Sequence, residues 1–240
     1  MFVPIRDENR LRSIPYQYVT LGLIAVNFAV FIGLQLPDLL QGDVCGQMLF
    51  AKLFGVVPIE LTGTQTTLDG CTLAGALSIP EPLTLISYQF LHGDVLHLLG
   101  NMLFLWVFGD NVEDALGHVR YLVFYLACGI AGALLHVVMT AEPSAPLIGA
   151  SAAIAGVVGA YLVLHPNVNV WVLVMRFFPL KLRAVWVLGA WVLMNLAFAV
   201  LSIDPLVAWW AHVGGIIAGI VLVVILRRPG VPLFDRGTTA

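Results

Sequence analysis

Six long apolar stretches alternate with polar segments along the 240-residue chain. A helix needs about 20 apolar residues to cross a lipid bilayer, and most of the stretches approach that length. Because the bilayer core offers no water to bond the backbone, each stretch is expected to be helical. The pattern therefore predicts an all-α polytopic membrane protein, a bundle of six transmembrane helices. The predicted helices cover residues 17–35, 95–115, 120–139, 151–165, 184–201 and 206–226.

The polar segments divide the chain into three parts. Residues 1–16 form a short amino end, residues 17–226 a single membrane domain, and residues 227–240 a tail. The one large piece outside the membrane is a loop at about 36–92. Within it, the amphipathic stretch Met48–Val57 is expected to lie on the membrane surface as a short helix.

One further apolar run, at residues 168–180, bears on the number of spans. It is too short to cross a bilayer and contains Arg176, so we interpret it as an interfacial segment or a loop. A seventh span at this place is the alternative.

The composition supports a membrane protein and excludes several other classes. Hydrophobic residues make up 60% of the chain, charged residues only 10%, and the mean hydropathy is +0.96. A soluble domain carries about 25% charged residues, so a soluble globule is excluded. The net charge of -3 offers no basic surface for a nucleic acid. The expected surroundings are a lipid bilayer, and no nucleic-acid partner is expected.

The basic residues indicate the orientation. With six spans and the amino end inside, ten of the 11 basic residues fall in cytoplasmic segments, and only Lys52 falls outside. Because positive residues are retained on the cytoplasmic side, both termini are expected in the cytoplasm and the long loop outside it. Asp7 and Glu8 make the amino end unlike an acid-poor transit peptide. This favours a multi-pass protein of the cell membrane, a bacterial plasma membrane.

Polar residues inside the predicted helices are candidates for function, because they are costly in lipid. No Asp, Glu, Lys or Arg lies in the middle of a span, which argues against an ion-coupled transporter, a proton pump or a voltage sensor. The polar residues are Asn27, His97, Asn101, Cys128, His136, Ser151, Asn195 and His212. Taken singly, a serine at a helix start is a cap, and a buried His or Asn closes a helix–helix hydrogen bond. His136 and Asn195 are interpreted in this structural way.

Spacing and depth place polar residues from three of the predicted helices at a similar depth in the membrane. His97 and Asn101 are four residues apart and share a helix face. Ser151 begins a short helix, and His212 lies early in the last helix, at a similar depth. Small residues at helical spacing follow both, and such stripes let two helices approach closely. The two stripes are Ser151, Ala155 and Gly159, and His212, Gly215 and Gly219.

This combination suits acyl transfer. A serine hydroxyl needs a neighbouring base to act as a nucleophile, and His212 can serve Ser151 in this way. Asn101, His97 and the backbone N–H of Ser151 can donate to the oxyanion of the tetrahedral intermediate. No carboxylate is available as a third member, so a Ser–His dyad is predicted. The cysteines and histidines lack ligand spacing, so no metal or other cofactor is expected.

Three motifs, in this order, resemble those of the rhomboid intramembrane serine proteases. FLHGDVLHLLGNMLFLWVFGDNVE, at residues 90–113, is similar to the HxxxN helix of the family. IGASAAIAGVVGAY, at residues 148–161, resembles the nucleophile helix, and AHVGGIIAG, at residues 211–219, resembles the base helix. The order, the spacing and the topology extend the resemblance over essentially the whole chain.

The resemblance implies an endopeptidase that cleaves transmembrane segments of other membrane proteins near their outer ends. It also implies that the loop at residues 202–205 and the fifth span form a mobile cap. The residues that it implies for the site are Ser151 as nucleophile, His212 as base, Asn101 and His97 at the oxyanion, and His92 at the mouth of the cavity.

Two residues depart from the family pattern. Ala152 follows the serine where Gly is usual, which adds a methyl group beside the oxyanion site. Ala155 stands where some members have an aromatic ring against the histidine. The alternative function is a non-catalytic rhomboid-like protein that binds membrane clients, although Ser151 and His212 are both present. A transporter or channel comes third, for lack of intramembrane charge.

The three cysteines have two expected roles. Cys45 and Cys71 fall in the loop that is expected outside the cytoplasm, where disulfides form. A disulfide between them would stabilise the part of the chain with the least membrane support, and two unpaired thiols are the alternative. Cys128, in the third span, is expected to act as a small hydrophobic residue.

Overall fold

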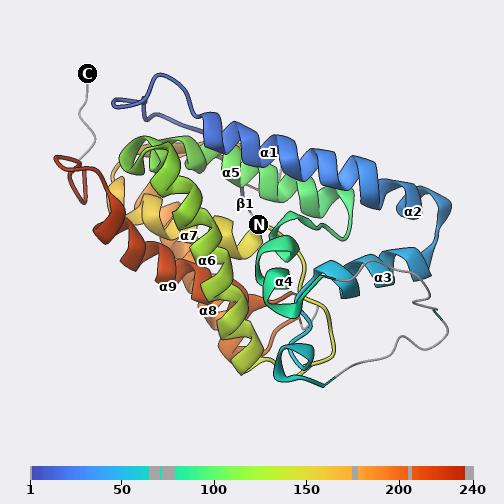
Figure 1. Cartoon of the computed structure of the whole chain (residues 1–240). Helices are drawn as coiled ribbons and strands as arrows, with labels where there is room; N and C mark the ends of the chain where they lie inside the picture. Colours follow the sequence, from blue (N-terminus) through green and yellow to red (C-terminus); the bar gives the residue numbers. More distant parts are fainter. Residues whose placement is uncertain (1, 65–70, 72–78, 175–177, 205–206, 236–240) are drawn as a thin grey trace.

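The computed structural model describes residues 2–64, 71, 79–174, 178–204 and 207–235. Its main body is a bundle of helices (Figure 1). The helices are α1 (Tyr18–Val30), α2 (Leu36–Gln41), α3 (Val44–Phe54), α4 (Glu81–Ser87), α5 (Val95–Leu116), α6 (His118–Met139), α7 (Ser151–Leu164), α8 (Ala184–Leu201) and α9 (Trp209–Leu226). A π-helical turn, Phe31–Gln35, joins α1 to α2, and two 3₁₀ turns lie at Glu60–Thr62 and Tyr88–Phe90.

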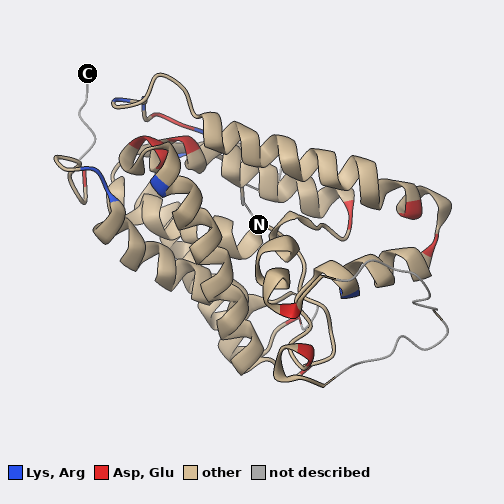
Figure 2. Ribbon diagram, in the orientation of Figure 1, with Lys and Arg blue, Asp and Glu red and all other residues tan. Residues whose placement is uncertain are grey.

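Each of the six predicted helices is present. The run from α1 through α2, and the helices α5, α6, α8 and α9, are long and apolar enough to cross a bilayer. The molecule is therefore a polytopic membrane protein with a helical bundle. α7 is shorter: its 14 residues cover about 21 Å at the helical rise of about 1.5 Å per residue. Figure 2 shows long helical stretches without charge, and charges gathered at helix ends and in loops.

The short helix α7 lies inside the bundle. Every residue from Ala152 to Tyr161 is buried, so these turns have no lipid-facing side. The helix contacts α5, α6, α8 and α9. Because these neighbours shield α7 from lipid, a polar group at its start is surrounded by protein rather than by hydrocarbon.

Glycines set the distance between α7 and α9. A Cβ added at Gly219 would collide with the backbone carbonyl of Gly156, and one added at Gly215 would collide with that of Ala152. Small residues thus let the two backbones touch, as the stripe on α9 predicted. The α7 atoms that meet this stripe belong to Ala152 and Gly156, one position along from the predicted Ser151 and Ala155.

Three antiparallel strands form a sheet that the hydropathy pattern did not predict. β1 (Phe2–Asp7) pairs with β2 (Asn169–Val174), which pairs with β3 (Phe178–Arg183). The interpretation of residues 168–180 as an interfacial segment or a loop missed these strands. Valine recurs at every second position from 168 to 174, which is the period of a strand. The amino end is likewise a strand over most of its first residues.

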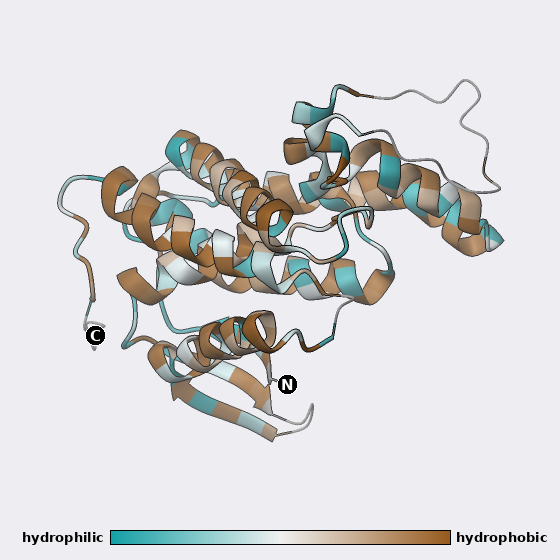
Figure 3. Cartoon of the chain, turned by 90° about the horizontal axis from the view of Figure 1, so that it is seen from below, coloured by the Kyte–Doolittle hydropathy of each residue, from teal (hydrophilic) through white to brown (hydrophobic). Residues whose placement is uncertain are grey.

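The sheet has two different faces. Val170 and Val172 of β2 are buried in the hydrophobic core. Trp171 lies between them and points the other way, with Arg6 5.7 Å and Lys181 5.9 Å from the centre of its ring. In Figure 3 the sheet lies at one margin of the helical bundle. The sheet therefore covers the bundle with an apolar face and presents a charged face outward.

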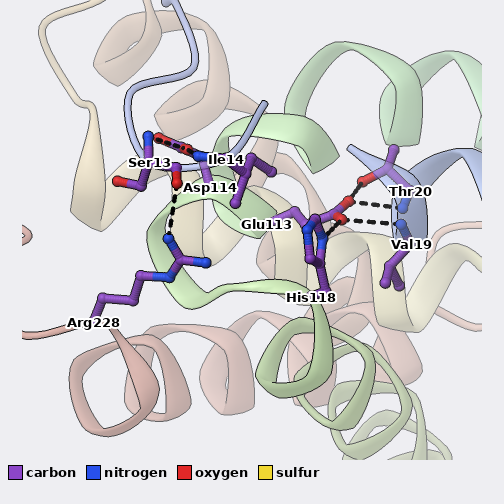
Figure 4. Close-up of polar contacts among 8 residues, drawn as sticks. All are labelled: Ser13, Ile14, Val19, Thr20, Glu113, Asp114, His118 and Arg228. Carbon is purple, nitrogen blue, oxygen red and sulfur yellow. Dashed lines mark hydrogen bonds and ion pairs between the residues drawn. The ribbon is translucent and has the colours of Figure 1, made fainter. Parts of the chain in front are cut away.

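Two carboxylates at the end of α5 hold the segment that leads into α1 (Figure 4). Asp114 accepts the backbone N–H groups of residues 12–14 at 2.7–2.9 Å. Glu113, fully buried, accepts the N–H groups of residues 19–20 at 2.8–2.9 Å and contacts His118. The first N–H groups of a helix have no partner within it, so Glu113 satisfies donors that α1 leaves open. We call this set the α5 clasp.

Asp7 anchors β1 to two helices. Its carboxylate accepts hydrogen bonds from Tyr161 Oη of α7 at 2.6 Å and from Asn111 Nδ2 of α5 at 3.0 Å. Burial is the main cause that raises the pKa of Asp7 to about 7, and the nearby Asp110 raises it further, against the effect of the Tyr161 bond. Asp7 therefore changes charge near neutral pH.

We expect Asp7 to make the folded protein less stable as the pH rises from about 4 to about 7. In this range the folded chain keeps a proton that the unfolded chain has lost, so the free energy of unfolding falls by up to roughly 1.4 kcal/mol per pH unit. Asp7→Asn should flatten this dependence, and the exposed-site control Glu142→Gln should leave it intact. Thermal unfolding in detergent at about pH 5 and about pH 7.5 measures the effect. An equal pH dependence in wild type and Asp7→Asn would contradict the prediction.

The long loop contains the predicted short helix and is closed by a disulfide. Helix α3 lies where the amphipathic stretch was expected. Cys45 and Cys71 form a disulfide with their Cα atoms 5.7 Å apart, which confirms the predicted pairing. Cys128 is free and buried, as expected for a small hydrophobic residue.

Removing this disulfide should lower stability more than it lowers activity. The bond joins positions 26 residues apart. In the chain-entropy model a disulfide that closes a loop of this length stabilises the folded protein by about 3 kcal/mol, because it restricts the unfolded chain. The double variant Cys45→Ser, Cys71→Ser should therefore melt several degrees lower and still react at Ser151. Melting with and without reductant is the measurement, and the variant, which keeps only Cys128, is the control that reductant should not change. Alkylation of all three cysteines in unreduced protein from an oxidising compartment would contradict it.

Candidate active site

A serine and a histidine meet where α7 and α9 begin. Ser151 is the first residue of α7, and His212 lies in the first turn of α9. Ser151 Oγ and His212 Nε2 are 2.8 Å apart, within hydrogen-bond distance. His212 is only 9% exposed. The close approach of the two helices thus places a hydroxyl against an imidazole in the buried interior of the bundle.

The second ring nitrogen of His212 has a partner that the sequence did not indicate. His212 Nδ1 lies 2.8 Å from Asn195 Oδ1 on α8. Asn195 is fully buried, and its Nδ2 donates to the backbone carbonyl of Trp191 at 2.7 Å. The contact with His212 joins α8 to α9, so it is the kind of helix–helix hydrogen bond that the sequence interpretation gave to Asn195. The interpretation did not name His212 as the partner, because nothing in the spacing of α8 shows which helix faces this side chain.

Two indole rings enclose the imidazole. The Trp191 ring is stacked at 25° with its centre 6.3 Å from that of His212, and Trp209 stands at 90° with its centre 5.7 Å away. Ala155, on α7, cannot supply the aromatic ring that some members of the resembling family place there. In this chain α8 and α9 supply aromatic contacts instead.

The extra methyl group of Ala152 points to a neighbouring helix. A Cβ added at Gly132 of α6 would lie 2.8 Å from Ala152 Cβ, so this methyl group occupies the space beside Gly132. The sequence had suggested a methyl group beside the oxyanion site. The observed contact gives Ala152 a packing role between α7 and α6.

Asn101 and His97 lie one turn apart on α5. Asn101 is 8% exposed, and its Nδ2 has no hydrogen-bond partner among the described residues. A buried donor without a partner is rare in folded proteins and is suited to an acceptor that arrives with a ligand. His97 accepts the Gly93 N–H at its Nδ1, at 3.4 Å. If Nδ1 accepts, Nε2 carries the proton and is a donor.

Gly149 lies between His97 and Ser151. Its φ of +125° is strained for any residue with a side chain. A Cβ added there would lie 2.9 Å from His97 Nε2 and 3.7 Å from Ser151 Oγ. The Gly149 N–H donates to the carbonyl of Tyr88 at 2.9 Å, which fixes the turn before α7. The missing side chain thus leaves His97 and Ser151 facing one small space.

His92 lies next to this group, but its ring makes no hydrogen bond to the described residues. Its ring is 1% exposed, neither ring nitrogen has a partner among the described residues, and it stands edge-on to His97 at 5.1 Å. Burial, followed by the neighbouring His97, lowers the pKa of His92 to about 3, so the ring is neutral. Gln35 fixes the backbone of His92 through two bonds of 2.9 Å and 3.0 Å. His92 also borders a cavity of about 470 Å³ under the long loop.

The remaining candidates lie outside the hydrogen bonds of the site. His136 Nδ1 and Asn27 Oδ1 have no partner within the part of the chain that the structure describes. Among those residues, no group of three or more His, Cys, Asp and Glu side chains could hold a metal ion.

The geometry first defines a class: a multi-pass helical membrane protein in which a serine and a histidine meet inside the bundle. The model of the Rhomboid domain family matches residues 80–229, a range that holds Ser151, His212, Asn101 and His97. This is more than half of the chain, and the chain belongs to the rhomboid family.

Individual relatives agree with this assignment. The chain is 30% identical over 202 residues to rhomboid protease GluP of Bacillus subtilis, which covers 80% of this chain and 37% of that one. It is 33% identical over 150 residues to RHOMBOID-like protein 5 of Arabidopsis thaliana, with 62% and 46% covered. It is 30% identical over 160 residues to Rhomboid-like protease 3 of Toxoplasma gondii, with 66% and 57% covered. The chain spans less than two thirds of the length of each of these relatives.

Proposed function

We propose that the chain is an intramembrane serine endopeptidase, which hydrolyses peptide bonds in or near transmembrane segments of other membrane proteins. The observation that supports this most directly is the contact between Ser151 Oγ and His212 Nε2 inside an apolar bundle. Two relatives carry the word protease in their names. Membrane proteins with transmembrane segments are the proposed partners, and the chemistry calls for no metal or other cofactor.

The proposed reaction is acyl transfer through a Ser–His dyad. Ser151 Oγ attacks the scissile carbonyl carbon while His212 Nε2 takes the hydroxyl proton. The C–N bond then breaks, and His212 gives the proton to the leaving amine. In the second half His212 deprotonates a water molecule, which attacks the acyl carbon on Ser151. The bond between this carbon and Ser151 Oγ then breaks, His212 gives the proton to Ser151 Oγ, and the carboxylic acid product leaves. His212 thus takes a proton in each attack and gives it up as the intermediate breaks down.

The oxyanion of the tetrahedral intermediate needs donors near Ser151. Asn101 Nδ2 is the strongest candidate, because it is buried and unsatisfied. His97 Nε2 and the backbone N–H of Ser151 at the start of α7 are the others. One such donor is typically worth about 2.7–4 kcal/mol in the transition state. These roles match the positions that the resemblance assigned to the same residues.

The helix α8 and the loop after it are proposed as a cap over the site. Trp191 of α8 lies over His212, and Trp209 Nε1 donates to the carbonyl of Ile203 at 2.6 Å. Ser202 and Asp204 in this loop have φ values of 52° and 54°, which are costly for these residues. Pro205, also part of the expected cap, lies outside the described residues. Movement of this segment would open the dyad to a substrate.

Loss of either member of the dyad should abolish proteolysis. Ser151→Ala removes the nucleophile and His212→Ala removes its base, so each should lower cleavage of a transmembrane substrate by at least about 10³-fold. The double variant should be no worse than either single variant, because the two residues act as one unit. Cleavage in detergent and labelling by a fluorophosphonate probe are the measurements, with circular dichroism to check the fold. A wild type that folds but neither cleaves nor labels would favour a rhomboid-like protein that only binds membrane clients.

The same proposal places the active site near the outer face of a bacterial plasma membrane, with both termini in the cytoplasm. A reporter fused after Arg236 should then be cytoplasmic, and one inserted near Asp69 should be external; both positions lie outside the described residues. The physical reason is the excess of basic residues on the side of the termini. Fusions to alkaline phosphatase and to a fluorescent protein measure the two sides. An external carboxyl end would contradict the prediction. If the reporter near Asp69 were external as well, the number of spans would be odd.

A further inference from the structure

We infer that Asn195 is a positioning residue for the base, so that the dyad works as a Ser151–His212–Asn195 triad. This inference rests on the proposed function and deepens it. The sequence had left the base without a third member, because no carboxylate lies at the right level. The structure offers an amide oxygen in that place, 2.8 Å from His212 Nδ1.

The orientation of the Asn195 amide follows from its second contact. Its nitrogen, Nδ2, lies 2.7 Å from the backbone carbonyl oxygen of Trp191, which can only accept. A flipped amide would set its oxygen against this carbonyl, so the nitrogen must face Trp191. The oxygen Oδ1 must then face His212, and this end of the contact is an acceptor.

An acceptor at Nδ1 selects the tautomer of His212. Because Asn195 Oδ1 has no proton to give, the Nδ1 of His212 must carry the hydrogen. A neutral imidazole with hydrogen on Nδ1 leaves Nε2 bare, and Nε2 is the atom that lies 2.8 Å from Ser151 Oγ. This is the tautomer that can accept the serine proton. The same Nδ1–H to oxygen bond also stabilises the imidazolium that forms during attack.

A second buried asparagine shows that helix packing alone does not explain this contact. Asn27 of α1 is fully buried and donates its Nδ2 to the carbonyl of Leu23 at 2.8 Å, four residues earlier, as Asn195 does to Trp191. Its Oδ1, however, has no partner among the described residues. The bond to the preceding turn is thus common to both residues, and the oxygen contact with His212 distinguishes Asn195. Asn27 is a matched control.

The contact also couples the base to the position of α8. Ser151 and His212 are held by α7 and α9, whereas Asn195 comes from α8. A displacement of α8 would remove the acceptor from Nδ1 and release the ring of His212 to rotate or to change tautomer. The triad would be complete only when α8 lies against α9, so the helix proposed as a cap would also set the competence of the base.

The test compares Asn195→Ala, Asn195→Asp and the control Asn27→Ala in purified full-length protein. Asn195→Ala should lower the rate of fluorophosphonate labelling at Ser151, and kcat for a transmembrane substrate, by roughly 10- to 100-fold with little change in KM. Asn195→Asp keeps an oxygen acceptor and should recover most of the loss. Asn27→Ala should leave the rate and kcat near the wild-type values.

Nitrogen-15 NMR of histidine-labelled protein reads the tautomer without any substrate. The His212 signals, identified by their loss in His212→Gln, should show a protonated Nδ1 and a bare Nε2 in wild type, in Asn195→Asp and in Asn27→Ala. In Asn195→Ala the hydrogen should redistribute between the two nitrogens.

Two results would overturn the inference. One is a wild-type labelling rate in Asn195→Ala; the other is an unchanged tautomer in that variant. A melting temperature that falls equally in Asn195→Ala and Asn27→Ala, with labelling intact, gives the first result and reduces Asn195 to packing. Failure of the proposed function is distinguishable, because a non-catalytic wild type would not label at all, while its NMR spectrum would still report the Asn195 contact.

Discussion

The close approach of α7 and α9 is the constraint on which the rest of the structure depends. In lipid the hydrophobic effect does not draw helices together, so contact between backbones has to supply the attraction and fix the register. Gly215 and Gly219 allow that contact, because a side chain at either position would collide with the facing backbone of α7. Ser151 and His212 lie at the beginnings of these two helices, and the register therefore sets the distance between their reactive atoms.

Other elements complete the site and fix the helices around it. At the site end, α5 supplies the unsatisfied amide of Asn101, and α8 supplies the partner of His212. At the far end of α5 the clasp gathers backbone N–H groups onto Glu113 and Asp114. An unsatisfied backbone group in an apolar medium costs several kcal/mol, so these bonds fix α1 relative to α5. One helix, α5, thus links the oxyanion site to the amino-terminal segment.

The hydropathy pattern predicted the helices, and the spacing of small residues predicted the contact between Ser151 and His212. Both signals lie within the sequence of a single helix, so they can be recognised without knowing the fold. The sheet escaped prediction in part because β1 pairs with β2 from the far half of the chain and has no partner nearby in sequence. The partner of Asn195 was missed for a related reason. An asparagine within an apolar helix always has the preceding carbonyl to bond, and only the packing of α8 on α9 shows where its oxygen points.

The pairing of β1 with β2 also determines when the sheet can form during synthesis of the chain. β1 leaves the ribosome before its partner β2, which is made only after α7 is complete. Until then the amino end exposes a row of unpaired N–H and C=O groups, which is a template for wrong associations. The closing of the sheet therefore coincides with the arrival of the helix that carries Ser151. A chain that stops before Asn169 leaves β1 without its partner strand. The unpaired edge of β1 therefore distinguishes an incompletely synthesised chain from one in which the sheet has formed.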